Sequence, residues 1–201
     1  MGTKMKTGSS DRTLCLVLTA FLTAIVGVLS YFGGFIKIGG LASISLTLVP
    51  VVLGAALLGP GTGAWLGAVS GAVFFLTADA AFWLSLSVFG TILTVIVKGT
   101  LAGLGAGLVY RLLEGKNRYL AMLAAAAVCP VINTGIFLLG CLVFFFDAVT
   151  SMANAEGSSV FLYLIVVFVG LNFVFELVLN LLLSPALLRL VDLGKKDLSK
   201  K

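Results

Sequence analysis

Histidine is absent from this chain, and charged residues make up only 10% of its 201 positions. Histidine is the commonest general base and metal ligand in proteins, so its absence removes the usual hydrolase and zinc-binding arrangements. Soluble domains carry about 25% charged residues, which excludes an ordinary soluble fold here. The 60% share of hydrophobic residues and the mean hydropathy of +1.20 instead indicate an integral membrane protein.

Cysteine pairs and phosphate-binding motifs are also lacking. Cys15, Cys129 and Cys141 lie in apolar segments without CxxC spacing, which predicts neither a disulfide framework nor a metal site. The glycine-rich segment 59–65 lacks the Gly-Lys-Ser/Thr ending that grips phosphate and magnesium, so it is interpreted as a turn. We therefore expect no catalytic residues, no metal, no cofactor and no ATPase activity within this chain.

Long apolar runs are the main feature that is present. A membrane-spanning helix needs about 20 predominantly apolar residues. The candidate spans are residues 14–32, 44–58, 62–77, 89–113, 119–146 and 160–191. We expect an all-α integral membrane protein whose six-helix bundle occupies residues 14–191. An N-terminal tail of residues 1–13 and a basic C-terminal tail of residues 192–201 flank it.

Turn and proline signals refine this prediction. The second and third runs are short and are separated only by Gly59-Pro60-Gly61, which predicts a tight helical hairpin. Pro130 and Pro185 lie inside the last two runs, where they predict a kink or a break.

Positive charge lies on one side of these spans. Eleven of the thirteen Lys and Arg residues fall in the N-terminal tail, near the 114–118 loop, and near the C-terminus. Cytoplasmic flanks of membrane helices collect Lys and Arg, so both termini are predicted to be cytoplasmic in a plasma membrane of bacterial type. The exterior connections then carry one cation, Lys37, and three acids: Asp79, Asp147 and Glu156. Basic flanks in this position fit the anionic headgroups of a lipid bilayer, and we expect no nucleic-acid partner.

Small residues recur at four-residue spacing on three predicted helices. Such rows let two helix backbones approach closely, either within the chain or against a partner protein. Ala20 and Ala24 form a short row on the first helix, where both packing and docking remain open. The third and fourth helices carry the longer rows, made of Gly63, Gly67 and Gly71 and of Gly99, Gly103 and Gly107.

Lys98 lies within the fourth predicted span. A lysine at a helix centre costs about 2.5–3.5 kcal/mol on insertion scales. Its ammonium must therefore snorkel to an interface, pair with an anion, or face a ligand cavity. A pair with Glu176 in the empty protein, displaced by a ligand carboxylate, is one hypothesis.

A polar stripe marks the sixth predicted helix. Asn172, Glu176 and Asn180 are spaced four apart and share one face, which cannot point at lipid. The stripe predicts either interhelical hydrogen bonds or one wall of a binding cavity. Asn133, beside Pro130 in the fifth span, is a candidate for the opposite wall.

Two exterior segments complete the candidate site. Lys37 lies between the glycine pairs of segment 33–40, a pattern that suits either a lid over an outward-facing pocket or a loop on the headgroups. Trp83 in the second exterior connection is either an interfacial belt residue or a pocket wall.

These features together resemble the substrate-binding S components of energy-coupling factor (ECF) vitamin transporters. The resemblance covers roughly residues 12–191. It rests on the small-residue row of the first helix, the segment LTLVPVVLGAALLGP at 46–60, Gly63, Gly67, and a basic residue in the fourth helix. The Leu-Gly-Pro-x-x-Gly element is its most specific part, and S components for different vitamins share it.

The resemblance implies a non-enzymatic subunit that binds a vitamin or related micronutrient from outside. It implies a transmembrane coupling protein and two ATPases as partners, with docking at the Ala20 and Ala24 row. Among substrates, the second and third helices look like those of pantothenate-type members, and Lys98 suits a carboxylate. The Pro-Arg pair of that subgroup is replaced here by Val97-Lys98, which leaves the substrate open.

Two other classes of protein compete with this interpretation. A membrane enzyme would need a catalytic constellation, and neither paired carboxylates nor a Ser/Lys arrangement is present. A scaffold or assembly protein would need only the glycine rows. The intramembrane Lys98 and the polar stripe argue against a pure scaffold.

Overall fold

The computed structural model describes residues 9–33 and 46–199, and every regular element in these ranges is helical. The chain proceeds through α1 (Ser9–Gly33), α2 (Leu48–Leu58), α3 (Pro60–Phe74), α4 (Ala78–Leu86) and α5 (Val88–Leu113). It continues through α6 (Arg118–Phe144), α7 (Phe146–Ala155), α8 (Val160–Tyr163), a π-helical segment (Leu164–Val169) and α9 (Gly170–Ser199).

Four of the described helices are long and apolar enough to cross a membrane. They are Arg12–Gly33 within α1, α5, α6, and Phe173–Lys196 within α9. A fifth span is possible if α3 and α4 are taken together, although they are bent by 85° at their junction. The 11-residue α2 is about 16 Å long at 1.5 Å per residue, against a hydrocarbon core of about 30 Å.

Two predicted exterior connections contain helices. Residues 78–88 and 147–159 were predicted to be exterior connections, and they hold α4 and most of α7. Both helices are short and begin with an acid in the first turn, Asp79 and Asp147, which favours the positive end of a helix dipole. α6 and α9 continue without a break through Pro130 and Pro185, so the predicted break is absent at both prolines.

The predicted hairpin of α2 and α3 is present and depends on one glycine. Gly59 ends α2 and precedes α3 with a φ of 106°, a conformation that side chains with a Cβ rarely adopt. Pro60 then begins α3, where its fixed φ suits the first turn and its missing N–H is not needed.

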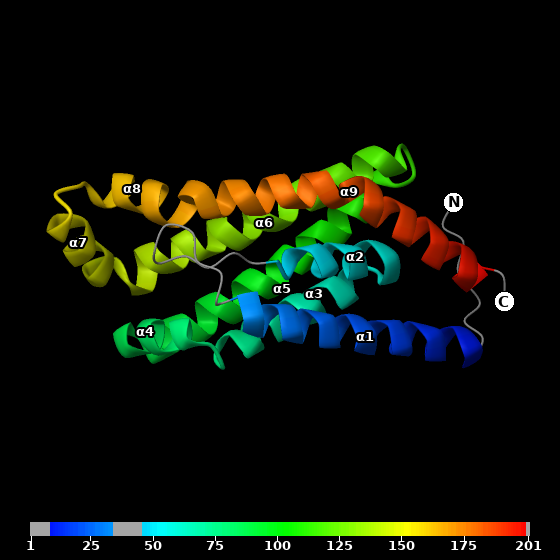
Figure 1. Cartoon of the computed structure of the whole chain (residues 1–201), viewed down its shortest axis with the longest axis horizontal. Helices are drawn as coiled ribbons and strands as arrows, with labels where there is room; N and C mark the ends of the chain where they lie inside the picture. Colours follow the sequence, from blue (N-terminus) through cyan, green and yellow to red (C-terminus); the bar gives the residue numbers. More distant parts are fainter. Residues whose placement is uncertain (1–8, 34–45, 200–201) are drawn as a thin grey trace.

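The start of α1, the end of α9 and the α5–α6 connection lie at the same end of the molecule (Figure 1), and α4 and α7 lie at the other end. Two ion pairs tie the first end together: Arg118 Nη1 lies 3.0 Å from Asp192 Oδ1, and Lys195 pairs with Glu114. The described cations other than Lys98 all belong to this end: Arg12, Arg111, Lys116, Arg118, Arg189, Lys195 and Lys196. This arrangement agrees with cytoplasmic termini.

The two glycine rows pack against each other. A Cβ on Gly67 would collide with the carbonyl of Gly99, and one on Gly63 would collide with the carbonyl of Gly103. A Cβ on Gly71 would come within 2.8 Å of the Val95 carbonyl oxygen. α3 and α5 therefore run antiparallel with their backbones in contact, as expected for small-residue rows. The internal-packing interpretation of these rows is confirmed.

α1 lies at the edge of the bundle. Only 11% of its apolar window is buried, against 39% for α5. Its inward face carries the buried Leu22 and Val26 and is joined to α3 by polar contacts. Trp65 Nε1 donates to Thr23 Oγ1 at 3.2 Å, and Ser30 Oγ donates to Ser70 Oγ at 3.1 Å. Ala20 and Ala24 lie on the exposed opposite face.

Candidate substrate site

Two clusters of buried apolar side chains occupy the two ends of the bundle. The inner cluster, nearer the termini, includes buried residues of α1, α2, α5, α6 and α9, such as Val52, Ala106, Met122 and Val191. The outer cluster joins α4, α6, α7, α8 and the π-helical segment, and it consists of Trp83, Cys141, Phe145, Val149, Ala153, Tyr163 and Leu164.

The predicted polar and charged site residues lie between these two clusters. On α5, Lys98 is one turn outward of Ala102, an inner-cluster residue. On α6, Asn133 falls between Ile132, which packs on the inner cluster, and Phe137, which packs on the outer one. On α9, Glu176 and Asn180 precede the inner-cluster residues Leu187 and Val191. The structure thus places a polar layer between two apolar ones.

Lys98 is half-buried and points toward aromatic rings. Its Nζ lies 5.0 Å from the centroid of the Phe137 ring and 6.0 Å from that of Phe74. A helical side chain leans toward the N-terminus of its helix, and α5 begins at the outer end, so the ammonium is directed outward. The Glu176 carboxylate is close enough to act on this ammonium electrostatically. The structure therefore places the two residues within electrostatic reach of each other, and their pairing stays a prediction.

The polar stripe of α9 faces the interior and is longer than the sequence analysis recognised. Glu176 is 2% exposed, Asn180 0% and Ser184 1%. Asn180 Nδ2 donates to the Glu176 carbonyl at 2.8 Å, and Ser184 Oγ donates to the Leu181 carbonyl at 2.7 Å. Ser184 continues the same four-residue spacing, which was the signal available for it. Asn172 belongs to α9, but its side chain is outside the described part of the structure.

Trp83 lies inside the outer cluster and is 7% exposed. Its ring meets those of Phe137 and Phe145 edge-on, at centroid distances of 5.3 Å and 5.2 Å. Thr91 Oγ1 donates to the Trp83 carbonyl at 2.7 Å and so fixes α4 on α5. A tryptophan of an interfacial belt would face lipid and headgroups, so this buried position argues against the belt interpretation, and the role of Trp83 as a pocket wall stays a prediction.

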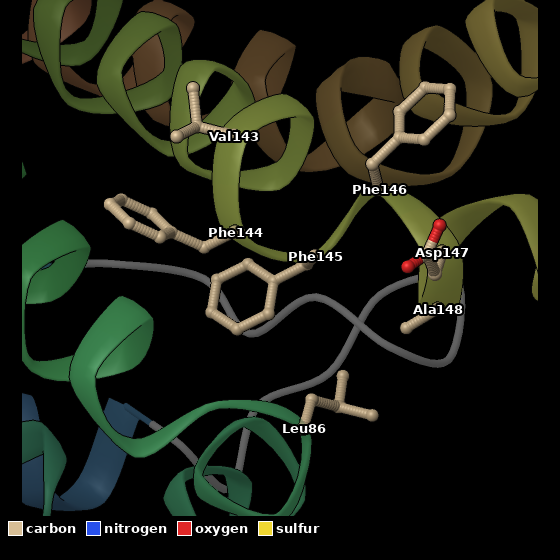
Figure 2. A pocket seen from close by; sticks show the side chains of 7 residues that line it. All are labelled: Leu86, Val143, Phe144, Phe145, Phe146, Asp147 and Ala148. Carbon is tan, nitrogen blue, oxygen red and sulfur yellow. The ribbon is translucent and has the colours of Figure 1, made fainter.

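A cavity of about 250 Å³ opens at the outer end, where α6 turns into α7. Leu86 of α4 and residues 143–148 line it. In Figure 2, Phe144 and Phe145 point to one side of the turn between α6 and α7, and Phe146 points to the other side. Phe145 also contacts Trp83, which contacts Phe137, the ring nearest Lys98. A continuous row of rings therefore connects the cavity with the polar layer.

Two further residues are predicted to belong to the site, Asn133 and Lys37. Asn133 is half-buried on α6, and Lys37 falls outside the described residues. Within the described residues, two buried polar atoms of this region have no hydrogen-bond partner: Thr94 Oγ1 on α5 and Asn180 Oδ1 on α9. The sequence does not mark Thr94 as a site residue, because it is one of three threonines in its span and their spacing carries no distinctive pattern.

Comparison with known families gives one match. A family model described as "ECF transporter, substrate-specific component" matches residues 15–188 of the chain. No curated protein and no solved structure matches it.

Proposed function

The chain belongs to the family of substrate-specific components of ECF transporters, and on this premise we propose that it captures a water-soluble vitamin or related micronutrient, with pantothenate as the first candidate, from the extracellular side. Members of this family are non-enzymatic, multi-pass proteins of the plasma membrane that serve an ECF module. Uptake would be driven by ATP hydrolysis in partner subunits, namely a transmembrane coupling protein and two ATPases.

The observation that carries the proposal is the arrangement of Lys98 with Phe137, Phe74 and Glu176. A charged lysine inside a span is costly, and the Glu176 carboxylate offsets part of that cost in the empty protein. A substrate carboxylate that reaches Lys98 takes over this role. The two rings give the apolar part of a small vitamin a surface to pack against.

Substrate access is proposed from the outer cavity. The cavity near the start of α7 faces the exterior end, and the rings of Phe145, Trp83 and Phe137 lead from it toward Lys98. Trp83 in this arrangement is the wall between the cavity and the site. Asn133, Asn172 and Lys37 are proposed to contribute hydrogen bonds or charge once the substrate is bound.

Docking on the coupling protein is proposed at the exposed face of α1. Ala20 and Ala24 lie on this face, and their small side chains permit close approach of another helix. α1 is also the least buried of the four long spans, so a large part of its surface is available to a partner.

The test is thermal unfolding of the purified chain in detergent with a panel of vitamins, pantothenate included. At 100 times its dissociation constant, a ligand that binds only the folded state adds about 2.7 kcal/mol to the free energy of unfolding. Lys98→Ala should abolish the stabilisation by a carboxylate ligand, whereas Lys116→Ala in the exposed α5–α6 connection should leave it unchanged. A folded wild-type protein that responds to no member of the panel would contradict the proposal.

The alternative of a scaffold assembled through the glycine rows is not supported. The rows of α3 and α5 are buried against each other, so their surfaces are not available to another protein.

A further inference from the structure

Resting on the proposed function, we propose that Thr94 is a further substrate-binding residue. Its hydroxyl hydrogen-bonds a polar group of the substrate while Lys98 holds the substrate's carboxylate. The substrate class that fits is a small carboxylic acid that carries a hydroxyl or amide close to its acid group.

The first argument is that the Thr94 hydroxyl is unsatisfied. Thr94 is 4% exposed, and its Oγ1 has no hydrogen-bond partner within the described residues. Threonines in helices commonly donate to the carbonyl four residues back. Thr100 of the same helix does so, donating to the Ile96 carbonyl at 2.7 Å, and the Thr91 hydroxyl lies 2.7 Å from both the Ser87 and the Trp83 carbonyl. The buried Thr94 hydroxyl is therefore left with both its donor and its acceptor capacity unused.

The second argument is its position relative to Lys98. Residues four apart on a helix share a face and are separated by about 6 Å along the axis. Because the Lys98 side chain leans toward the start of α5, its ammonium extends toward the level of Thr94. The distance between the two groups is therefore within the span of a single small molecule.

The third argument comes from the facing helix. A Cβ on Gly140 of α6 would collide equally with the hydroxyl and the methyl group of Thr94. Gly140 is one turn beyond Phe137, the ring 5.0 Å from the Lys98 Nζ. Thr94, Gly140, Phe137 and Lys98 thus lie along one seam between α5 and α6. The absence of a side chain at Gly140 gives the Thr94 side chain its place in this seam.

The chemistry of the two groups sets the substrate class. An ammonium only donates hydrogen bonds, whereas a hydroxyl both donates and accepts. A carboxylate satisfies the ammonium, and a neighbouring hydroxyl or amide of the same molecule satisfies Thr94. A vitamin without a carboxylate leaves Lys98 with Glu176 and gains nothing from this arrangement.

The test compares Thr94→Val, which removes the hydroxyl at nearly constant shape, with Thr94→Ser, which retains it. Thr100→Val is the matched control, because that hydroxyl is already bonded to a carbonyl of its own helix. The probes are three carboxylates, pantothenate, nicotinate and biotin, and three vitamins without a carboxylate, thiamine, riboflavin and pyridoxine. Binding is measured by calorimetry, and the melting temperature of each empty variant is measured beside it.

We expect a carboxylate to bind the wild type, Thr94→Val to weaken that binding about 10- to 100-fold, and Thr94→Ser to stay within about threefold. The empty Thr94→Val protein should melt at the same or a higher temperature, because a buried unsatisfied hydroxyl has been removed. Thr100→Val should bind as the wild type does.

Three outcomes would overturn the proposal while leaving the proposed function intact. These are unchanged affinity in Thr94→Val, a lowered melting temperature in its empty form that accounts for the loss of binding, and binding only of vitamins without a carboxylate. Failure of the wild type to bind any probe would instead contradict the proposed function, and this proposal with it.

Discussion

Glu176 is the charged residue that acts electrostatically on the intramembrane Lys98. The carboxylate is 2% exposed, belongs to a stripe that faces the bundle interior, and acts on the half-buried Lys98. Removing one partner of a buried charge pair is more costly than the pair itself is worth, because the other charge remains. Under the proposed function, this interaction would offset part of the cost of Lys98 and would compete with an anionic substrate.

Glu176→Gln separates these two effects. The amide keeps the shape but not the charge, so the empty protein should lose about 1–3 kcal/mol of its free energy of unfolding. Pantothenate should bind more tightly, because its carboxylate no longer competes with Glu176 for Lys98. Melting temperature and calorimetry check the two parts.

Asp192→Asn is the matched control for this variant. Asp192 also pairs with a cation, Arg118, but its side chain is 45% exposed at the cytoplasmic end. Exposed pairs contribute about 0–1 kcal/mol, so both stability and binding should change little. Wild-type affinity for pantothenate in Glu176→Gln would rule out displacement of the Lys98–Glu176 pair by the substrate.

At the scale of elements, the close packing of the two glycine rows determines how α3 and α5 are assembled. A Cβ on Gly67 would meet the backbone of Gly99, and backbone atoms cannot rotate away as a side chain does. We expect Gly67→Ala to lower the free energy of unfolding by about 3 kcal/mol. Thermal unfolding in detergent measures the loss.

Gly135→Ala provides the comparison, since a Cβ there meets nothing within 4 Å. Alanine is favoured over glycine in a helix interior by about 0.8–1 kcal/mol, so this variant should be neutral or more stable. Equal melting temperatures for Gly67→Ala and Gly135→Ala would contradict the close contact between the backbones of α3 and α5.

The exposed face of α1 makes a separate prediction. Replacing Ala20 and Ala24 by leucine adds bulk on the side away from Leu22 and Val26, so folding and pantothenate binding should persist. Association with the coupling protein, measured by co-purification from membranes, should be lost because the helices can no longer approach closely.

Leu182→Phe on α9 controls for bulk added elsewhere on the outer surface, since Leu182 is 72% exposed. It should leave co-purification unchanged. If the double leucine variant co-purified as well as the wild type, the docking surface would lie elsewhere.

At the scale of the whole molecule, charge fixes the orientation. The described cations other than Lys98 belong to the end that holds the termini, and the acids Asp79, Asp147 and Glu156 belong to the other end. In a background without native cysteines, Asp147→Cys should react with an impermeant maleimide added to intact cells. Lys116→Cys should react only after the membrane is opened. The reverse labelling pattern would invert the topology.

Several features of this protein follow from the sequence alone. The apolar runs, the turn at Gly59 and the one-sided distribution of Lys and Arg predict membrane helices, the α2–α3 hairpin and cytoplasmic termini. They do so because each membrane helix satisfies its own backbone hydrogen bonds and because the cytoplasmic flanks of membrane helices collect Lys and Arg. The spacing of Glu176 and Asn180 likewise predicts a shared face, since helix geometry is local.

The tertiary structure decided which faces meet. A membrane helix is apolar on nearly every side, so hydrophobic periodicity does not reveal how it is rotated against its neighbours. The close packing of the glycine rows fixes that rotation for α3 and α5. The bend between α3 and α4, the burial of Trp83, the approach of Lys98 to Glu176 and the position of Thr94 against Gly140 all depend on contacts between different helices. No local pattern encodes such contacts, and they are the contacts on which the proposed substrate site rests.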